Sequence, residues 1–315
     1  MRIAAFCICA VLAAAPAAAQ TDALPEWSQV ETVVVNADEG GPAMWQVSRG
    51  DSHVWILGAV QPLPEGLQWN SARLEKVVTG ARAIYTQPRA SAGILGGIWF
   101  FLTNRDAIYL PGDDKVEGVL PEPLLGRFMA ARKEAGRDAD RYEDYRLPIA
   151  ALMLESDVLK KRGFAGDVFE DRLRKIARNA GVTMRPIADY DALKMLKELP
   201  KLSAEQNLAC VSDALDDIDQ LRASARPSAE AWADGDLAAL MAAYRQSRFE
   251  RCLAAVSTAR ALWERSVRDT LAKVDDALSK PGKVLIVVGI DALLRKNGVL
   301  ERLRAKGFTV DDPVN

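Results

Sequence analysis

The sequence has little of several residue types on which common functions depend. It contains one histidine, His53, and four cysteines among 315 residues. A zinc site with two imidazole ligands therefore cannot be built from this chain. The net charge is −2, so no overall basic surplus favours nucleic acid or anionic lipid. The 49% of hydrophobic residues still suffice for a large core in a soluble globular protein.

Long apolar runs are missing beyond the N-terminus, so no other segment is long enough to span a membrane. Arg2 precedes an apolar run from Ile3 to Ala15, which is followed by Pro16-Ala17-Ala18-Ala19. This order is typical of a secretory signal peptide, and we predict a signal over residues 1–19. An uncleaved membrane anchor is the alternative. The mature protein is expected to be periplasmic or secreted.

Two of the cysteines, Cys7 and Cys9, fall inside the predicted signal peptide. The mature chain then keeps Cys210 and Cys252, both in helical-looking segments. An even pair in an exported protein predicts one disulfide that joins two helices. Two buried free thiols are the alternative.

The hydrophobic pattern predicts an α/β fold: a central mixed, mostly parallel sheet flanked by helices, with a large helical insertion over residues 123–278. Residues 20–41 are polar and predict a flexible mature N-terminus, and residues 42–312 form a single predicted domain. Strands are predicted over residues 44–48, 53–57, 83–86, 182–187, 284–289 and 308–310, and two of the helices over 204–222 and 228–248. The apolar residues 90–102 are too few to span a bilayer, and a buried or lid-like segment is favoured over a membrane-touching loop.

The strands that end before Gly58 and Gly289 are the most informative stretches, because open α/β sheets place their sites at the carboxyl ends of strands. Several motifs share a fixed order along the chain: Pro42–Ser48, Asp51–Gly58, Glu264-Arg265, Val287-Val288-Gly289, Asn297–Leu300 and Leu303–Phe308. In order and spacing they resemble the TraB/PrgY/GumN family, which includes TIKI-type proteases. The resemblance covers nearly the whole mature chain. It implies an EreA/ChaN-like or TIKI-like fold and a hydrolytic metal centre of two histidines and a glutamate.

This sequence departs from that centre at each of its three positions. Gln61 stands at the first histidine, Gln87 at the glutamate and Ala292 at the second histidine. An amide is a neutral, weak ligand for zinc or manganese and no general base near neutral pH, and alanine has no donor atom. We therefore predict no metal, no cofactor and no assured catalytic residue, which makes the chain more a pseudoenzyme than an enzyme.

Asp291, one residue before Ala292, could rebuild a centre together with Glu264 and Arg265. The competing interpretations are a helix-capping carboxylate for Asp291 and structural ion pairs for the other two, including Arg265 with Asp269. Two interpretations are also open for other residues. The acidic cluster on one helix is either a cation site or a solvated face: Asp213, Asp216, Asp217 and Asp219. His53 is either a catalytic base or a residue at the end of a strand. Four aromatic residues line either the cleft or the core: Trp55, Trp69, Trp99 and Phe100.

The function expected from these features is that of an exported, catalytically inactive relative of metal-dependent hydrolases and proteases, which binds a peptide, glycan or protein partner through an inherited cleft. The alternatives are an active metal-dependent hydrolase with a rebuilt site and a structural periplasmic scaffold. We expect no nucleic-acid partner and no stable membrane span after signal cleavage.

Overall fold

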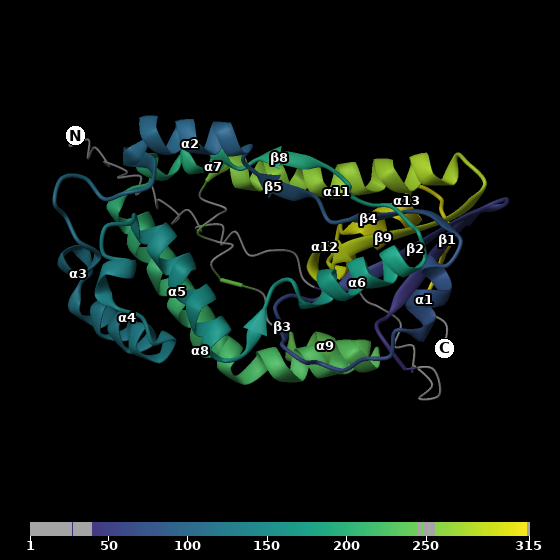
Figure 1. Ribbon diagram of the computed structural model, residues 1–315, viewed down its shortest axis with the longest axis horizontal. Helices are drawn as coiled ribbons and strands as arrows, with labels where there is room; N and C mark the ends of the chain where they lie inside the picture. The colour runs from purple at the N-terminus through teal and green to yellow at the C-terminus, as the bar shows by residue number, and fades with distance from the viewer. Residues whose placement is uncertain (1–26, 28–39, 245–246, 249–251, 253–255, 314–315) are drawn as a thin grey trace, which may run out of the picture.

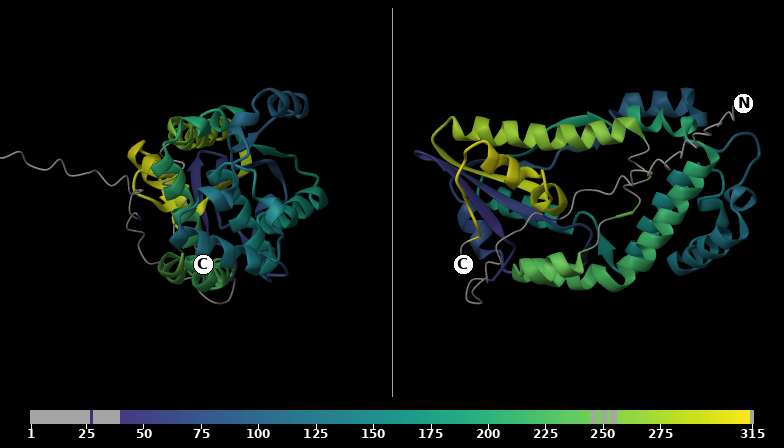
Figure 2. Two further views of the ribbon diagram at one scale, coloured as in Figure 1. Left: turned by 90° about the vertical axis from the view of Figure 1, so that its left-hand side faces the viewer. Right: turned by 180° about the vertical axis from the view of Figure 1, so that it is seen from behind.

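The computed structural model describes residues 27, 40–244, 247–248, 252 and 256–313. The predicted signal peptide, residues 1–19, lies outside these residues, as does nearly all of the predicted N-terminal tether, residues 20–41. The molecule is elongated, with its large sheet toward one end and a group of packed helices toward the other (Figures 1 and 2).

The large sheet has six strands in the order β10-β1-β2-β9-β4-β7. They are β1 (Met44–Arg49), β2 (Ser52–Ala59), β4 (Ala81–Thr86), β7 (Met184–Pro186), β9 (Gly282–Gly289) and β10 (Val310–Asp311). Neighbours from β2 to β7 are parallel, whereas β1 is antiparallel to both β2 and β10. The predicted mixed, mostly parallel α/β sheet is confirmed. Two short pairs, β3 (Leu63–Pro64) with β6 (Phe164–Ala165) and β5 (Arg89–Ser91) with β8 (Asp189–Asp191), lie beside it.

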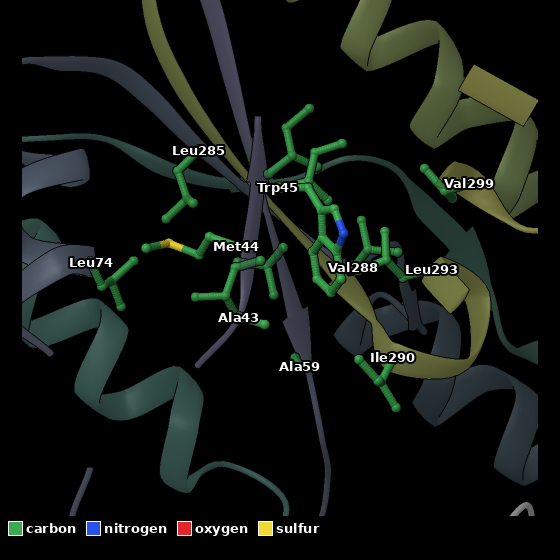
Figure 3. Packing of buried hydrophobic residues seen from close by; sticks show 14 of the residues in the cluster. Ala43, Met44, Trp45, Ala59, Leu74, Leu285, Val288, Ile290, Leu293 and Val299 are labelled. Carbon is green, nitrogen blue, oxygen red and sulfur yellow. The ribbon is translucent and has the colours of Figure 1, made fainter. Parts of the chain in front are cut away.

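Helices cover both faces of the sheet, so its central strands are nearly continuous runs of Val, Ile and Leu. Figure 3 shows Leu74 and Met44 on one side of the strands and Trp45, Val288 and Leu293 on the other. The surrounding helices are α1 (Ala72–Val78), α6 (Val168–Asn179), α11 (Ser257–Leu278), α12 (Ile290–Leu294) and α13 (Val299–Ala305). Because side chains alternate along β1, consecutive residues point to opposite faces of the sheet and pack in the core on either side of it.

A second core lies among α4 (Glu122–Ala135), α5 (Leu147–Lys161) and the first half of α8 (Ala204–Asp234). The prediction of separate helices over 204–222 and 228–248 is wrong here, since α8 continues through Pro227. Buried residues on both sides of this proline, Ala225 and Ala229, hold the helix together where local propensity would end it. The helix ends at Gly235, whose φ is +75°, and α9 (Leu237–Ala243) follows. The remaining helices are α2 (Ile94–Thr103), α3 (Val116–Val119), α7 (Leu193–Leu196), η2 (Arg105–Ala107), η3 (Ala139–Arg141) and η4 (Leu199–Lys201).

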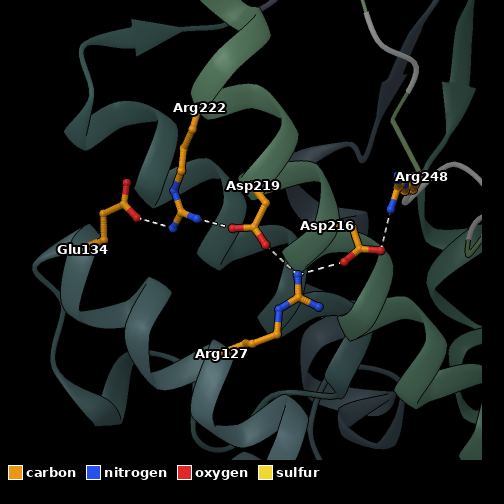
Figure 4. Close-up of polar contacts among 6 residues, drawn as sticks. All are labelled: Arg127, Glu134, Asp216, Asp219, Arg222 and Arg248. Carbon is orange, nitrogen blue, oxygen red and sulfur yellow. Dashed lines mark hydrogen bonds and ion pairs between the residues drawn. The ribbon is translucent and has the colours of Figure 1, made fainter.

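Polar and covalent contacts tie α8 to its neighbours. Cys210 on α8 forms a disulfide with Cys252, 42 residues later. Arg127 of α4 donates to Asp216 and Asp219, both at 2.8 Å (Figure 4). Asp216 and Asp219 of the acidic run on α8 are therefore in structural ion pairs and do not form a purely solvated face.

The prediction that residues 90–102 are buried is wrong, whereas the lid-like alternative stays a prediction. These residues form part of β5 and all of α2 except its last residue, Thr103, and most large side chains of α2 are exposed. Phe100 is the buried exception, at 4% exposed. Within the described residues, no helix has the length and apolar character that a membrane crossing requires.

Candidate functional site

Three parallel strands from distant parts of the sequence end at one edge of the sheet. Ala59 of β2 lies beside Gly289 of β9, and β4 runs parallel to β9 on its other side, ending at Thr86. The chain leaves this edge toward Gln61, Gln87 and Ala292. The fold therefore brings the three family-equivalent positions to the carboxyl edge, where parallel α/β sheets place their sites.

A cleft of about 500 Å³ opens at this edge. Its lining is Gln61, Thr86, Gln87, Pro88, Arg89, Phe169, Glu170, Arg174, Met184, Arg185, Pro186 and Val287. The amide oxygen of Gln87 would lie 3.0 Å from a Cβ atom on Gly289, so the glycine makes room for this side chain. Ala292 is not among the lining residues; it lies in α12, partly buried against the sheet core.

A glycine is needed at position 58 because neighbouring side chains leave no room for a Cβ atom, and not because of its backbone conformation. An added Cβ would lie 2.7 Å from Cδ1 of Ile290 and 3.1 Å from Cδ2 of Leu293. Figure 3 shows Ile290 and Leu293 near Trp45, whose ring is also within 3.4 Å of that position. The carbonyl of Gly58 accepts a 2.7 Å hydrogen bond from Nε1 of Trp232 on α8. The strand end, α12 and α8 are thereby locked together.

Replacing Gly58 with alanine is expected to lower the free energy of unfolding by about 2 kcal/mol, because overpacked buried groups must shift. Urea denaturation of the two proteins measures the change. Gly118→Ala is the control, since no atom lies within 4 Å of an added Cβ at that position. Equal stability of Gly58→Ala and the original protein would contradict the packing argument.

Charged residues on the cleft wall are mainly basic. Arg89, Arg174 and Arg185 line it, against one acidic residue, Glu170. Arg89 is paired with Asp189 at 2.8 Å and Arg174 with Glu170 at 3.2 Å. Within the described residues, no carboxylate forms an ion pair with Arg185, the middle residue of β7. Sequence reasoning missed these arginines, although the strand-end rule applied to β4 would have pointed to Arg89, three residues after Thr86.

The donor set at the family-equivalent positions does not fit a zinc or manganese ion. Gln61 and Gln87 offer neutral amides, and Ala292 offers no donor atom. Across the described part of the chain, no three His, Cys, Asp or Glu side chains group closely enough to hold a metal. These three positions therefore supply no metal centre of the kind that the family resemblance implies.

Two of the three residues of the predicted rebuilt centre, Asp291 and Arg265, have partners outside the cleft. Asp291 accepts a 2.9 Å hydrogen bond from Nε of Arg295 and another bond from the hydroxyl of Tyr244. Glu264 and Arg265 are exposed on α11, where Arg265 pairs with Asp269 at 3.4 Å. None of the three is among the described residues that line the cleft. The rebuilt centre stays a prediction.

The aromatic residues considered for the cleft lie elsewhere, and Phe169 lines it instead. Trp69 packs in the core against Trp232, with ring centroids 5.4 Å apart. Trp99 is exposed on α2. His53 lies at the opposite end of β2 from the cleft, with Nδ1 2.9 Å from the hydroxyl oxygen of Ser48.

Two further cavities adjoin Gln61, and both contain Glu155 of α5. One, of about 160 Å³, is also lined by Asp217, and the other has about 520 Å³. Burial raises the pKa of Glu155 to about 7, and the negative charge of Asp217 adds to this shift. Asp217 accepts hydrogen bonds from the Ser247 hydroxyl at 2.6 Å and the Arg248 backbone N–H at 2.7 Å. No local pattern in the sequence points to this carboxyl, because its partial burial depends on how α5 packs against α8.

The fold and the cleft define an α/β protein with a polar site at the carboxyl edge of a mostly parallel sheet. The model of the TraB/PrgY/gumN family matches residues 43–312, and the chain belongs to this family. The resemblance predicted from the sequence is thereby confirmed. No curated protein and no solved structure matches the chain.

Proposed function

We propose that this protein is an exported ligand-binding member of its family that does not carry out metal-dependent hydrolysis. One observation carries the proposal: Gln61 and Gln87, which stand where the family resemblance implies a histidine and a glutamate, line the same cleft. Amides that cannot hold zinc firmly or abstract a proton can still donate and accept hydrogen bonds. The inherited cleft then serves recognition of a peptide, glycan or protein partner.

The wall of the cleft favours a ligand that carries negative charge. Arg185 has no ion pair within the described residues, and a guanidinium binds carboxylate or phosphate through two parallel hydrogen bonds. Phe169, Met184 and Val287 add apolar surface beside it. Acidic peptides and acidic glycans combine these features, so they are the ligand classes that we propose.

Replacing Arg185 with alanine is expected to weaken binding of an acidic ligand about tenfold or more, because a charge-assisted hydrogen bond is lost. Titration calorimetry with a tetraglutamate peptide and with a trigalacturonate oligosaccharide measures the change. Arg178→Ala is the matched control, since Arg178 is an exposed arginine of α6 that does not line the cleft. Identical affinities of both variants would count against the cleft as the binding site.

Export is part of the proposal and is supported by two features of the chain. The first is the order of charge, apolar run and small residues over positions 1–19. The second is the bond between Cys210 and Cys252, since disulfides persist in oxidising compartments. Cell fractionation, with mass measurement of the N-terminus, tests the location and cleavage after Ala19.

A second candidate function is supported by Glu155. A carboxyl that keeps its proton near neutral pH can act as a general acid, and a nearby ionised carboxylate can act as its partner. Glu155 and Asp217 line one cavity beside Gln61, and the pKa of Glu155 is about 7. This pair would support hydrolysis without a metal, unlike the centre built from Asp291, Glu264 and Arg265.

A further inference from the structure

An unusual concentration of exposed apolar side chains lies on α2. Large hydrophobic residues that are strongly exposed number six in the described part of the chain, and five of them are on this helix: Leu95, Ile98, Trp99, Phe101 and Leu102. Leu95 is 83% exposed, Trp99 69% and Leu102 66%. A contiguous apolar patch of this kind usually marks a surface that another molecule covers.

Helix α2 has no charged residue along its ten positions, Ile94–Thr103. It lies at the outer edge of the molecule beside α7 (Figures 1 and 2). Among the described side chains of α2, that of Phe100 is buried, and the Phe101 ring contacts Tyr109 edge-on with centroids 6.0 Å apart. A Cβ atom on Gly96 would lie 3.9 Å from Leu193 of α7. The helix is thus attached to the protein along one side and open to its surroundings along the rest.

Basic side chains border this apolar surface. Lys194, Lys197 and Lys201 are exposed along α7 and η4, and Nζ of Lys197 lies 5.8 Å from the centre of the Phe100 ring. Arg105, two residues after the end of α2, is also exposed. The exposed carboxylates nearby are Asp106 and Asp191, so basic groups outnumber acidic ones. The overall charge of −2 hides this local excess.

We propose that α2 inserts into the surface of a lipid bilayer that contains anionic lipid. Apolar side chains with tryptophan among them and a border of lysine and arginine are typical of helices that lie in the membrane interface. At about 1.5 Å per residue the helix is roughly 15 Å long, half the thickness of a bilayer core, so it lies on the membrane and does not cross it.

A second copy of the chain fits this surface less well. A stable protein interface uses about 20–30 residues on each side, which is more than one ten-residue helix supplies. Two copies related by a twofold axis would also bring the same lysine border against itself. Anionic headgroups complement that border, and acyl chains complement the helix.

The fluorescence of Trp99 tests the proposal on the full chain. Vesicles with brominated acyl chains are expected to quench the part of the emission that the Trp99→Phe variant lacks. This difference reports on α2 alone, whatever the N-terminal segment does. Quenching is expected to be stronger with phosphatidylglycerol than with phosphatidylcholine alone. Replacing Lys194, Lys197 and Lys201 with alanine should weaken partitioning into anionic vesicles by about fivefold per residue.

Paired substitutions distinguish insertion of α2 into the membrane from non-specific hydrophobic adsorption of the protein. Leu95→Glu with Leu102→Glu is expected to reduce vesicle partitioning about tenfold or more, because both exposed leucines would enter the interface. Leu152→Glu, on α5, should leave it unchanged, although Leu152 is also an exposed leucine, at 53%. Circular dichroism checks that each variant folds.

Three results would overturn the proposal. The first is the absence of any Trp99-specific quenching by brominated lipid. The second is a lipid-free dimer that the Leu95→Glu, Leu102→Glu variant dissociates, which would make a second copy the occupant. The third is protection of Trp99 from acrylamide in lipid-free monomer, which would make another part of this chain the cover.

Discussion

Replacing Gln61 with histidine, Gln87 with glutamate and Ala292 with histidine is expected to create a zinc site with a dissociation constant of about 1 μM or tighter, which corresponds to roughly 8 kcal/mol. Two imidazoles and a carboxylate are ligands that zinc prefers. The three positions follow parallel strands that end at one edge, and Gln61 and Gln87 already line one cleft. Calorimetric titration with zinc, supported by metal analysis of the purified protein, measures the gain.

The matched control keeps the new residue types but displaces one ligand. It combines Gln68→His with Gln87→Glu and Ala292→His, since Gln68 is an exposed glutamine whose amide donates to the Gly66 carbonyl outside the cleft. We expect this variant and the original protein to bind zinc at least a hundredfold more weakly. Equal binding by both triple variants would show that these three positions do not form one inherited centre.

Much of the sheet could be predicted from local patterns. The strand from Met44, the turn at Gly50-Asp51 and the returning strand follow from alternation and turn residues, and β1 and β2 pair as an antiparallel hairpin. The strand-helix-strand order of β2, α1 and β4 predicts a parallel pair; the two strands do run parallel, but each pairs with β9 and not with the other. This order could not reveal that β9, from the far end of the chain, lies between them. Long-range strand order depends on packing of both faces, which no local pattern records.

Two helices show where local reasoning fails for physical reasons. The sequence pattern predicted separate helices over 204–222 and 228–248, but buried contacts on both sides of Pro227 keep α8 continuous. The apolar composition of α2 predicted burial, yet a helix that is apolar on every side has no polar face to indicate which part meets water. Its exposure depends on whether another element covers it, and among the described residues only one side is covered.

Part of the candidate site could likewise be predicted from the sequence, and part could not. Gln61 and Gln87 could be found because each follows a strand, and strand ends converge in a parallel sheet. Arg174 on the cleft wall and the partly buried carboxyl of Glu155 could not be predicted from the sequence. These residues come from α6 and α5 and reach the site through tertiary packing. The amino-acid sequence thus predicted the position of the site better than its electrostatic character.

Replacing Glu155 with glutamine is expected to raise the free energy of unfolding at pH 8 by about 3 kcal/mol. In the folded protein burial raises the pKa of this carboxyl to about 7, compared with an ordinary value of 4.5 in the unfolded chain. The folded state therefore binds more protons between pH 4.5 and 7, so stability falls as the pH rises through this window. Below pH 4.5 the carboxyl is protonated in both states, and the variant should match the original protein.

Denaturation with urea at pH 4, 6 and 8 measures this dependence, and Glu134→Gln provides a control of opposite sign. Burial of Glu134 opposes its ionisation, but the ion pairs with Arg222 and Arg162 outweigh burial and lower its pKa. Figure 4 shows the contact with Arg222. Its stabilising effect is present above the unfolded pKa and disappears in acid, so Glu134→Gln should destabilise the protein at pH 8. A Glu155→Gln variant that gains nothing at pH 8 would contradict the buried state of this carboxyl.

The same Glu155→Gln variant separates the two candidate functions. If Glu155 donates a proton in metal-free hydrolysis, the variant abolishes turnover of acidic peptides and glycans while it stabilises the fold, as is common for residues strained by function. If the cleft only binds its ligand, the variant keeps the affinity that Arg185→Ala loses, because Glu155 is not among the residues that line the cleft. Product analysis by mass spectrometry in the presence of a metal chelator, beside calorimetric affinities, distinguishes these outcomes.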